Sequence, residues 1–386
     1  MSPGDSYFSR RANLYEPFLF NLYLERYQYW RDRDVQIINL YNVRPLTQGV
    51  MKEVNPIQFN QVVEELKDYL KLNQSYKILL FPNQFSAYYT LFFSILDLND
   101  EILTPTPIPY FLKQYAESLG LKLLYIETSM IDDFDLPYRK EVESKITPRA
   151  KLFYYSAPGF SGSTVYPEET LERILFVSRN YYLYLAIDET LSHLVNNREE
   201  YITMQDIAVE NERIIRVLSP LKDFSMDDIT ILIVHKALPL RIDRITRDLF
   251  PISPYQLSFL DYFIRNNEEI KEERREEMNI KRKIIENFME RREDISVSIT
   301  KASGSVFINL PIPNTETFVE WLFTDYNRDK KTIFVAPAVH FHQDTYEDNG
   351  EILIDYRYLD SEMLEEGLEI LSDALDLYLG LKKEDQ

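Results

Sequence analysis

Short apolar runs recur between residues 77 and 236, and the segments between most of them are long enough for a helix. Continuous rather than alternating apolarity is typical of strands that are buried on both faces of a sheet. Strands that alternate with helices predict a mainly parallel sheet with helices on both sides. The runs are KILLF (77–81), LKLLYIE (121–127), KLFYYS (151–156), YLYLAID (182–188), RIIRVLS (213–219) and TILIVHK (230–236).

The composition of the sequence changes after Pro251, from apolar runs to a highly charged segment. Residues 266–294 are highly charged and predict a long, solvated connecting helix, and further apolar runs and a final helix follow it. A chain of 386 residues exceeds what one core usually organises. We therefore expect an N-terminal arm with part of a small domain (1–50), a large domain (51–265), and the connecting helix with a smaller C-terminal α/β domain (266–386).

Charge and composition exclude several classes of protein. A formal net charge of −20 disfavours nucleic-acid binding, which needs a basic face. The absence of cysteine excludes disulfides and thiolate sites, and four histidines provide poorly for metal ligation, so no metal is expected. Neither a signal peptide nor an apolar run long enough to cross a membrane is visible in the sequence, so we expect a cytoplasmic protein.

Two charged residues stand at strand ends, where parallel sheets bind their ligands. Asp188 closes the run 182–188, and Lys222 follows the next run, 34 residues later. A carboxylate there would be costly unless a cation or a proton donor met it. An aspartate that protonates a heterocyclic nitrogen and a lysine that forms an imine are the two groups that pyridoxal 5'-phosphate requires. On the residues alone, an ordinary buried ion pair or two unrelated charges remain alternatives.

The surrounding segments resemble the class I/II aminotransferases, which have the type I fold of pyridoxal-phosphate enzymes. YYLYLAIDETL is similar to the family's strand that ends in its aspartate, and VLSPLKDFSMDDITI is similar to its lysine segment. The resemblance implies that Asp188 faces the pyridine nitrogen, that Lys222 binds the aldehyde, and that Ser219 binds the phosphate. Collinear similarities cover nearly the whole chain, at 94–110, 303–312, 331–341 and 361–371.

The sequence departs from the family where the cofactor phosphate would bind. Asn83 and Gln84 stand where the family has glycine followed by alanine or serine. Two larger side chains therefore lie at a helix N-terminus, where the family leaves the backbone N–H groups open to the phosphate. Thr230 stands where the family has an arginine, and its hydroxyl offers one hydrogen bond but no charge. We nevertheless expect Ser219 and Thr230 to hold the phosphate, and Asn83 and Gln84 to be among the residues that bind the cofactor.

Other departures lie around the ring of the cofactor. The aromatic residue that covers the ring aligns with Pro109, and a one-residue shift would bring Tyr110 there instead. Phe160 and Leu191 replace an asparagine and a tyrosine that bond the phenolic oxygen in the family.

The substrate side also lacks its usual arginine. The arginine that binds the substrate carboxylate aligns near Ile354, and Arg357 lies three residues further on, an odd offset that faces the other side of a strand. Arg357, if a bulge or break redirects it, and Arg44 in the N-terminal segment are the candidate substrate-binding cations. His340 and His342 offer a weak metal motif, for which a polar surface loop is the plainer interpretation.

Taken together, the resemblance implies a pyridoxal-phosphate-dependent, aminotransferase-like enzyme. Its partner would be a small amino acid or amino compound in a specialised biosynthetic pathway, and the fold implies a homodimer. One alternative is a catalytically degenerate protein that keeps the fold for binding or as a scaffold. Another is a lyase, cyclase or oxidase that uses the same lysine and aspartate.

Overall fold

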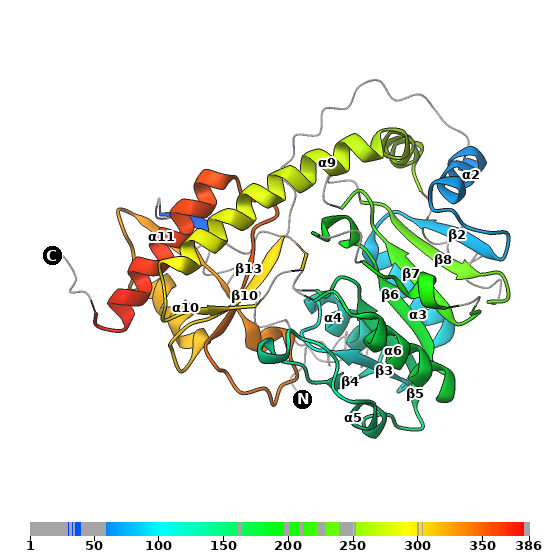
Figure 1. The fold of residues 1–386 in the computed structure, drawn as a ribbon, viewed down its shortest axis with the longest axis horizontal. Helices are drawn as coiled ribbons and strands as arrows, with labels where there is room; N and C mark the ends of the chain where they lie inside the picture. Colours follow the sequence, from blue (N-terminus) through cyan, green and yellow to red (C-terminus); the bar gives the residue numbers. More distant parts are fainter. Residues whose placement is uncertain are drawn as a thin grey trace, which may run out of the picture.

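The computed structural model of the chain describes most of the residues from 59 onward. The described ranges are 59–160, 164–196, 201–208, 211–222, 228–238, 252–298 and 304–381, with the shorter pieces 30, 33, 35–39, 250 and 301–302. Figure 1 shows a large sheet with helices on one side of the view, and a smaller helix-and-strand unit on the other.

A seven-stranded sheet forms the large part of the molecule, in the order β2-β8-β7-β6-β5-β3-β4. Only β8 runs against its neighbours, so the predicted mainly parallel sheet is confirmed. All six apolar runs of the sequence form strands of this sheet. The strands are β2 (Tyr76–Phe81), β3 (Glu101–Pro105), β4 (Lys122–Ile126), β5 (Ala150–Ser156), β6 (Tyr184–Asp188), β7 (Ile214–Leu218) and β8 (Thr230–His235).

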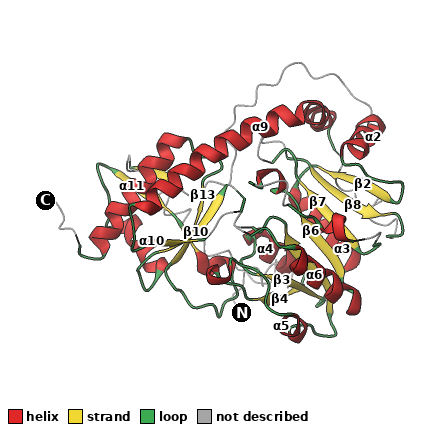
Figure 2. Cartoon of the chain, viewed as in Figure 1, coloured by secondary structure: helices red, strands yellow, loops and turns green. Residues whose placement is uncertain are grey.

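Both faces of the sheet are covered, as continuous apolar strands require. Alternate residues of β2 and β8 point to opposite faces: Leu232 packs toward α3 and α4, whereas Ile231 packs toward α2 and α9. A third cluster packs α5 and α6 against β5 and β6. Figure 2 shows the resulting layers. The helices are α2 (Phe59–Tyr69), α3 (Gln84–Ile95), α4 (Tyr110–Ser118), α5 (Arg139–Ser144), α6 (Glu168–Asn180) and α7 (Met204–Ile207).

The long helix α9 (Pro254–Glu290) joins the two parts of the molecule (Figure 1). It begins before the charged stretch because Ser253 caps it, with Gln256 completing a capping box and proline in the first turn. It is less solvated than the sequence predicts. Its first half packs on β2 and β8, and its second half buries Met278 in the core of the smaller part.

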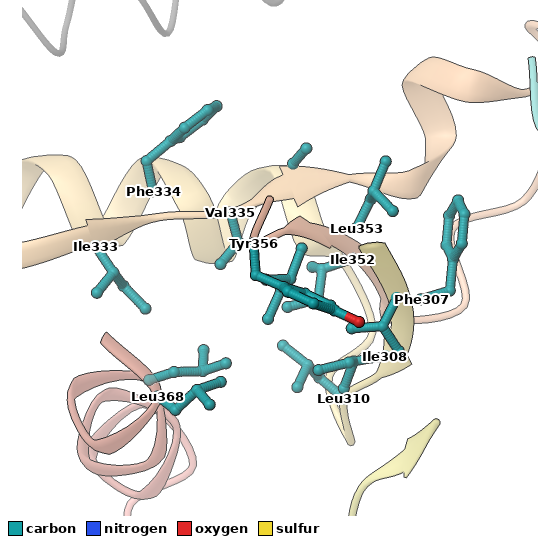
Figure 3. Close-up of a cluster of buried hydrophobic side chains, with 14 of the residues drawn as sticks. Phe307, Ile308, Leu310, Ile333, Phe334, Val335, Ile352, Leu353, Tyr356 and Leu368 are labelled. Atoms are coloured by element: carbon teal, nitrogen blue, oxygen red, sulfur yellow. The ribbon is translucent and has the colours of Figure 1, made fainter. Parts of the chain in front are cut away.

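The smaller part contains a four-stranded sheet and a two-stranded sheet around its own core. The first has the order β12-β13-β10-β9, and the second pairs β1 with β11 in parallel, so a segment near the N-terminus joins the C-terminal part. Figure 3 shows the core around Tyr356. The elements are β1 (Gln36–Asn39), β9 (Ser296–Val297), β10 (Ser305–Asn309), α10 (Thr315–Thr324), β11 (Lys331–Phe334), β12 (Ala336–Pro337), β13 (Glu351–Asp355) and α11 (Ser361–Tyr378).

The domain boundaries at residues 50 and 265 stay a prediction, and α9 runs across the second of them. Within the described part of the chain, every helix is too short or too polar to cross a membrane.

Candidate functional site

Asp188 is buried at the carboxyl end of β6, in the middle of the large sheet. Asp188 lies in register with Ser156 of β5 and Val217 of β7, and it is 6% exposed. The sequence predicts this position for Asp188, because the apolar run 182–188 ends at that residue. A buried carboxylate needs donors around it, and the structure shows which groups supply them.

Neutral groups, rather than a cation, hold the Asp188 carboxylate. The hydroxyls of Tyr88 and Tyr154 donate to Oδ2 at 2.7 and 3.2 Å, and Nε2 of Gln84 lies 3.4 Å from the same oxygen. The backbone N–H of Thr190 donates to Oδ1 at 3.0 Å. Burial, followed by the charge of Asp188, raises the pKa of Tyr88 well above its usual value, so its hydroxyl keeps the proton that it donates.

Lys222 lies in the turn after β7 and reaches toward the same region. Its Nζ donates to Oε1 of Gln84 at 2.9 Å and lies 5.6 Å from the centre of the Phe111 ring. The Tyr358 hydroxyl donates to the Lys222 carbonyl at 3.1 Å and ties this turn to the smaller part of the molecule. Lys222 is half-buried, so its amine faces the protein rather than open solvent.

Gln84 therefore bridges the two residues that the sequence singled out. Its carbonyl oxygen accepts from Lys222, and its amide nitrogen points at Asp188. Asp188 and Lys222 are thus brought to one place, as predicted, but a side chain lies between them. The simple buried ion pair, one of the alternatives from the sequence, is not what the structure shows.

The residues predicted to hold the cofactor phosphate already have partners within the protein. Asn83 caps α3, and its Oδ1 accepts from the backbone N–H of Ser86 at 2.8 Å. This places a side-chain oxygen where an anion would meet the helix N-terminus. Ser219 Oγ and Thr230 Oγ1 lie 2.7 Å apart, and both residues are buried.

An aromatic ring, that of Phe111, lies beside Lys222. Tyr110 begins α4, and its ring meets the edge of Phe111 at 6.3 Å between centroids. Phe111 lies 5.5 Å from the ring of Tyr88. Phe111 is thus the aromatic side chain that lies over the lysine, and the cover of a cofactor ring by Tyr110 stays a prediction.

Sequence reasoning also missed Tyr88 and Tyr154, although signals for both were present. Tyr88 lies four residues after Gln84 on α3, and residues at that spacing share one face of a helix. Tyr154 lies two residues before Ser156 on β5, so both side chains point to the same face of the sheet.

Of the two predicted substrate cations, the structure describes one. Arg357 is 7% exposed, and its guanidinium donates to the Asp355 carboxylate from Nε at 3.0 Å and from Nη2 at 2.6 Å. The strand β13 ends at Asp355, so the break that the prediction required is present, but it turns Arg357 toward this neighbouring acid. Arg44 lies outside the described residues.

Pyridoxal phosphate does not fit the described residues in this arrangement. Its ring would need the space between Lys222 and Asp188, where Gln84 lies. Its phosphate would need the N-terminal N–H groups of α3, one of which Asn83 already caps.

The two histidines of the HFH motif are buried, which corrects the expected surface loop. The His342 ring stacks on Tyr346 at 3.8 Å, and its Nδ1 lies 3.3 Å from Oε2 of Glu127. The His340 side chain is 6% exposed. Among the described residues, no group of three or more histidine or acidic side chains is placed to hold a metal ion.

His340 should make stability depend on pH. Burial, followed by the charge of Lys113, lowers its pKa from 6.5 to about 4. Between these values the unfolded chain binds a proton that the folded chain does not, so stability falls as the pH falls from 6.5 to 4. Glu316 Oε1 lies 3.4 Å from Nε2 and would partly stabilise a charged ring, but burial outweighs it.

We expect the free energy of unfolding to fall by about 2 to 3 kcal/mol over this pH range through His340. Urea unfolding at several pH values would measure it, in the wild type and in His340→Gln. The variant should show a shallower decline, and equal slopes in both proteins would contradict the prediction.

Comparison with known proteins finds distant relatives among the aspartate aminotransferases. No family model matches the chain. It is 23% identical over 297 residues to a probable aspartate aminotransferase of Methanocaldococcus jannaschii, covering 73% of each chain. It is 22% identical over 293 residues to an aspartate aminotransferase of Pyrococcus horikoshii, covering 72% of each.

Solved structures show the same fold over nearly the whole chain. An aspartate aminotransferase of Thermotoga maritima superposes with a TM-score of 0.79 at 18% identity, covering 96% of this chain and 100% of that one. A multiple substrate aminotransferase of Thermococcus profundus gives a TM-score of 0.79 at 14% identity, covering 98% and 100%. The predicted aminotransferase type I fold is therefore confirmed.

Proposed function

We propose that this chain, a low-identity relative of the class I aminotransferases with their fold over nearly its whole length, keeps that fold for binding rather than for transamination. Members of the family use pyridoxal phosphate. The observation that carries the proposal is the Gln84 side chain, which fills the space between Lys222 and Asp188 with hydrogen bonds toward both.

The energies of these contacts favour a site that is closed to the cofactor. The Gln84 amide has charged groups on both sides, and a hydrogen bond to a charged group contributes about 1.5 to 3 kcal/mol. A bound cofactor would have to break these contacts and the Asn83 cap. Thr230, in the place of a family arginine, supplies a hydroxyl but no charge to offset that cost.

A second candidate is a pyridoxal-phosphate-dependent enzyme, favoured by the retention of Lys222, Asp188 and Ser219 at the same end of the sheet. Gln84 would then have to turn away to open the site. Because Arg357 is bound to Asp355, this enzyme would favour amino compounds that lack a carboxylate. The small amino substrate, the specialised pathway and the homodimer implied by the resemblance belong to this candidate.

The absorption spectrum of the purified protein after incubation with pyridoxal phosphate and dialysis distinguishes the two candidates. We expect no band from lysine-bound cofactor in the wild type, and the same spectrum for Lys222→Ala, because Gln84 keeps the amine and the carboxylate engaged. A stoichiometric band that disappears in Lys222→Ala would overturn the binding proposal and support the enzyme. Amines without a carboxylate would then be tested as donors.

A further inference from the structure

A phenylalanine of the large part lies in the core of the smaller part. Phe134 follows the short 3-10 turn η2 (Met130–Asp132), which lies between β4 and β5. It is 2% exposed and belongs to the core of the smaller part, where its ring lies 5.0 Å from that of Phe307 of β10. Burial of an aromatic side chain removes a large apolar area from water, so this contact favours the association of the two parts.

The backbone that presents this ring is strained. Asp133 and Phe134 have φ angles of +51° and +55°, in the left-handed region that bulky side chains rarely adopt. Such a conformation persists only where its surroundings hold it. Here the N–H of Phe134 donates to the Ser129 carbonyl at 2.8 Å, and the Thr164 hydroxyl donates to the Asp133 carbonyl at 3.0 Å. Burial of the ring favours the contact and the strain opposes it, so the contact is poised to open.

Further apolar side chains of the large part pack against the same core. Leu194 is 1% exposed there, and the ring of Phe160 lies 5.3 Å from that of Phe341. Leu191 packs against this core as well. Phe160 and Leu191 stand where the aminotransferases have polar residues that bond the cofactor. In this chain, those two positions contribute to the interface between the two parts instead.

Two backbone hydrogen bonds cross this interface. The N–H of Ile108, between β3 and α4, donates to the Phe341 carbonyl at 2.7 Å. The N–H of Asn196, after β6, donates to the Lys301 carbonyl at 3.0 Å. Because a bonded amide hydrogen exchanges with water only when its bond opens, these two amides report on whether the interface is closed.

We propose that Phe134 is a latch, whose buried ring holds the two parts together and whose withdrawal from the core opens the interface. Opening would also release the turn that carries Lys222, because the Tyr358 hydroxyl of the smaller part donates to the Lys222 carbonyl at 3.1 Å. The latch therefore controls access to the candidate site. The inference does not rest on the proposed function, since it concerns how the two parts are held and not which ligand they bind.

Hydrogen exchange measured by mass spectrometry at a series of low urea concentrations tests the latch. Ile108 is a favourable reporter because Pro107 and Pro109 on either side of it carry no amide hydrogen. In the wild type, exchange at Ile108 and Asn196 should depend weakly on urea, since opening exposes little surface. Exchange within β6 should depend strongly on urea, because it requires global unfolding. Phe134→Ala should accelerate exchange at both reporters about tenfold or more.

Phe263→Ala is the matched control. Phe263 is 3% exposed in the core between α9 and the large sheet, which is separate from the core that contains Phe134. The control should accelerate exchange within β6 and leave Ile108 and Asn196 within about twofold of the wild type at low urea. Should Phe134→Ala fail to fold, Phe134→Leu keeps part of the apolar volume and should accelerate both reporters by a smaller factor, about threefold.

The rate at which acetic anhydride acetylates Lys222 is the second readout. It should rise in Phe134→Ala in parallel with exchange and stay unchanged in Phe263→Ala. The inference fails if the reporters of the wild type show the same urea dependence as β6, or if Phe263→Ala accelerates them as much as Phe134→Ala does. It also fails if exchange accelerates in Phe134→Ala while acetylation of Lys222 does not.

Discussion

Replacing Asn83 and Gln84 with glycine should convert this protein into one that binds pyridoxal phosphate. Without the Gln84 side chain, Lys222 Nζ loses its 2.9 Å partner, and the space between it and Asp188 opens. Without the Asn83 side chain, the N–H of Ser86 becomes available to an anion. Glycine is tolerated at the N-cap at a cost of only a few tenths of a kcal/mol, so the helix should persist.

We expect the double variant to bind the cofactor about a hundredfold more tightly than the wild type, since at least two competing contacts are removed. Equilibrium dialysis would measure the affinity, and adding Lys222→Ala should remove the absorption band of lysine-bound cofactor. Asn314→Gly is a matched control, because Asn314 caps α10 in the same way, by accepting from the N–H of Thr317 at 2.7 Å. If the double variant binds no better than the wild type, Gln84 is not what closes the site.

Replacing Glu189 with alanine should cost about 3 to 5 kcal/mol of unfolding free energy, as removal of one partner from a buried ion pair generally does. Glu189 and Arg216 have side chains 4% and 14% exposed, and Arg216 donates to both carboxylate oxygens. Burial alone would lower the pKa of Arg216, but the Glu189 charge reverses that effect and raises it. Without Glu189, a guanidinium that is 14% exposed remains charged with its main partner gone.

Urea unfolding at neutral pH would measure this loss. Glu65→Ala is the control, because Glu65 accepts from Arg265 at 2.9 Å in an exposed pair, where removal should cost less than about 1 kcal/mol. The double variant Glu189→Leu with Arg216→Met should recover most of the stability, since apolar residues often replace buried ion pairs without loss. A loss below about 1 kcal/mol for Glu189→Ala would show that water reaches the pair.

The prediction of strands was accurate where apolar residues are continuous. All six predicted apolar runs form strands. The sheet has a seventh strand, β3, which the sequence did not predict because Thr104 and Pro105 shorten its apolar run. The long helix begins at Pro254, before the charged segment, because its first half is apolar and packs on the large sheet. In this protein, local patterns locate strands well and the ends of helices less well.

The sequence by itself determined the fold class and brought Asp188, Ser219 and Lys222 to one edge of the sheet, because the apolar runs locate the strands and parallel strands end at the same edge. Thr230 was added by the resemblance to the aminotransferases. Only the tertiary structure decided what these residues bind. Gln84 meets Asp188 across 104 residues of chain and Lys222 across 138, and Arg357 turns to Asp355 where the strand ends. Such contacts depend on where packed elements place side chains in space, which spacing along a sequence does not contain.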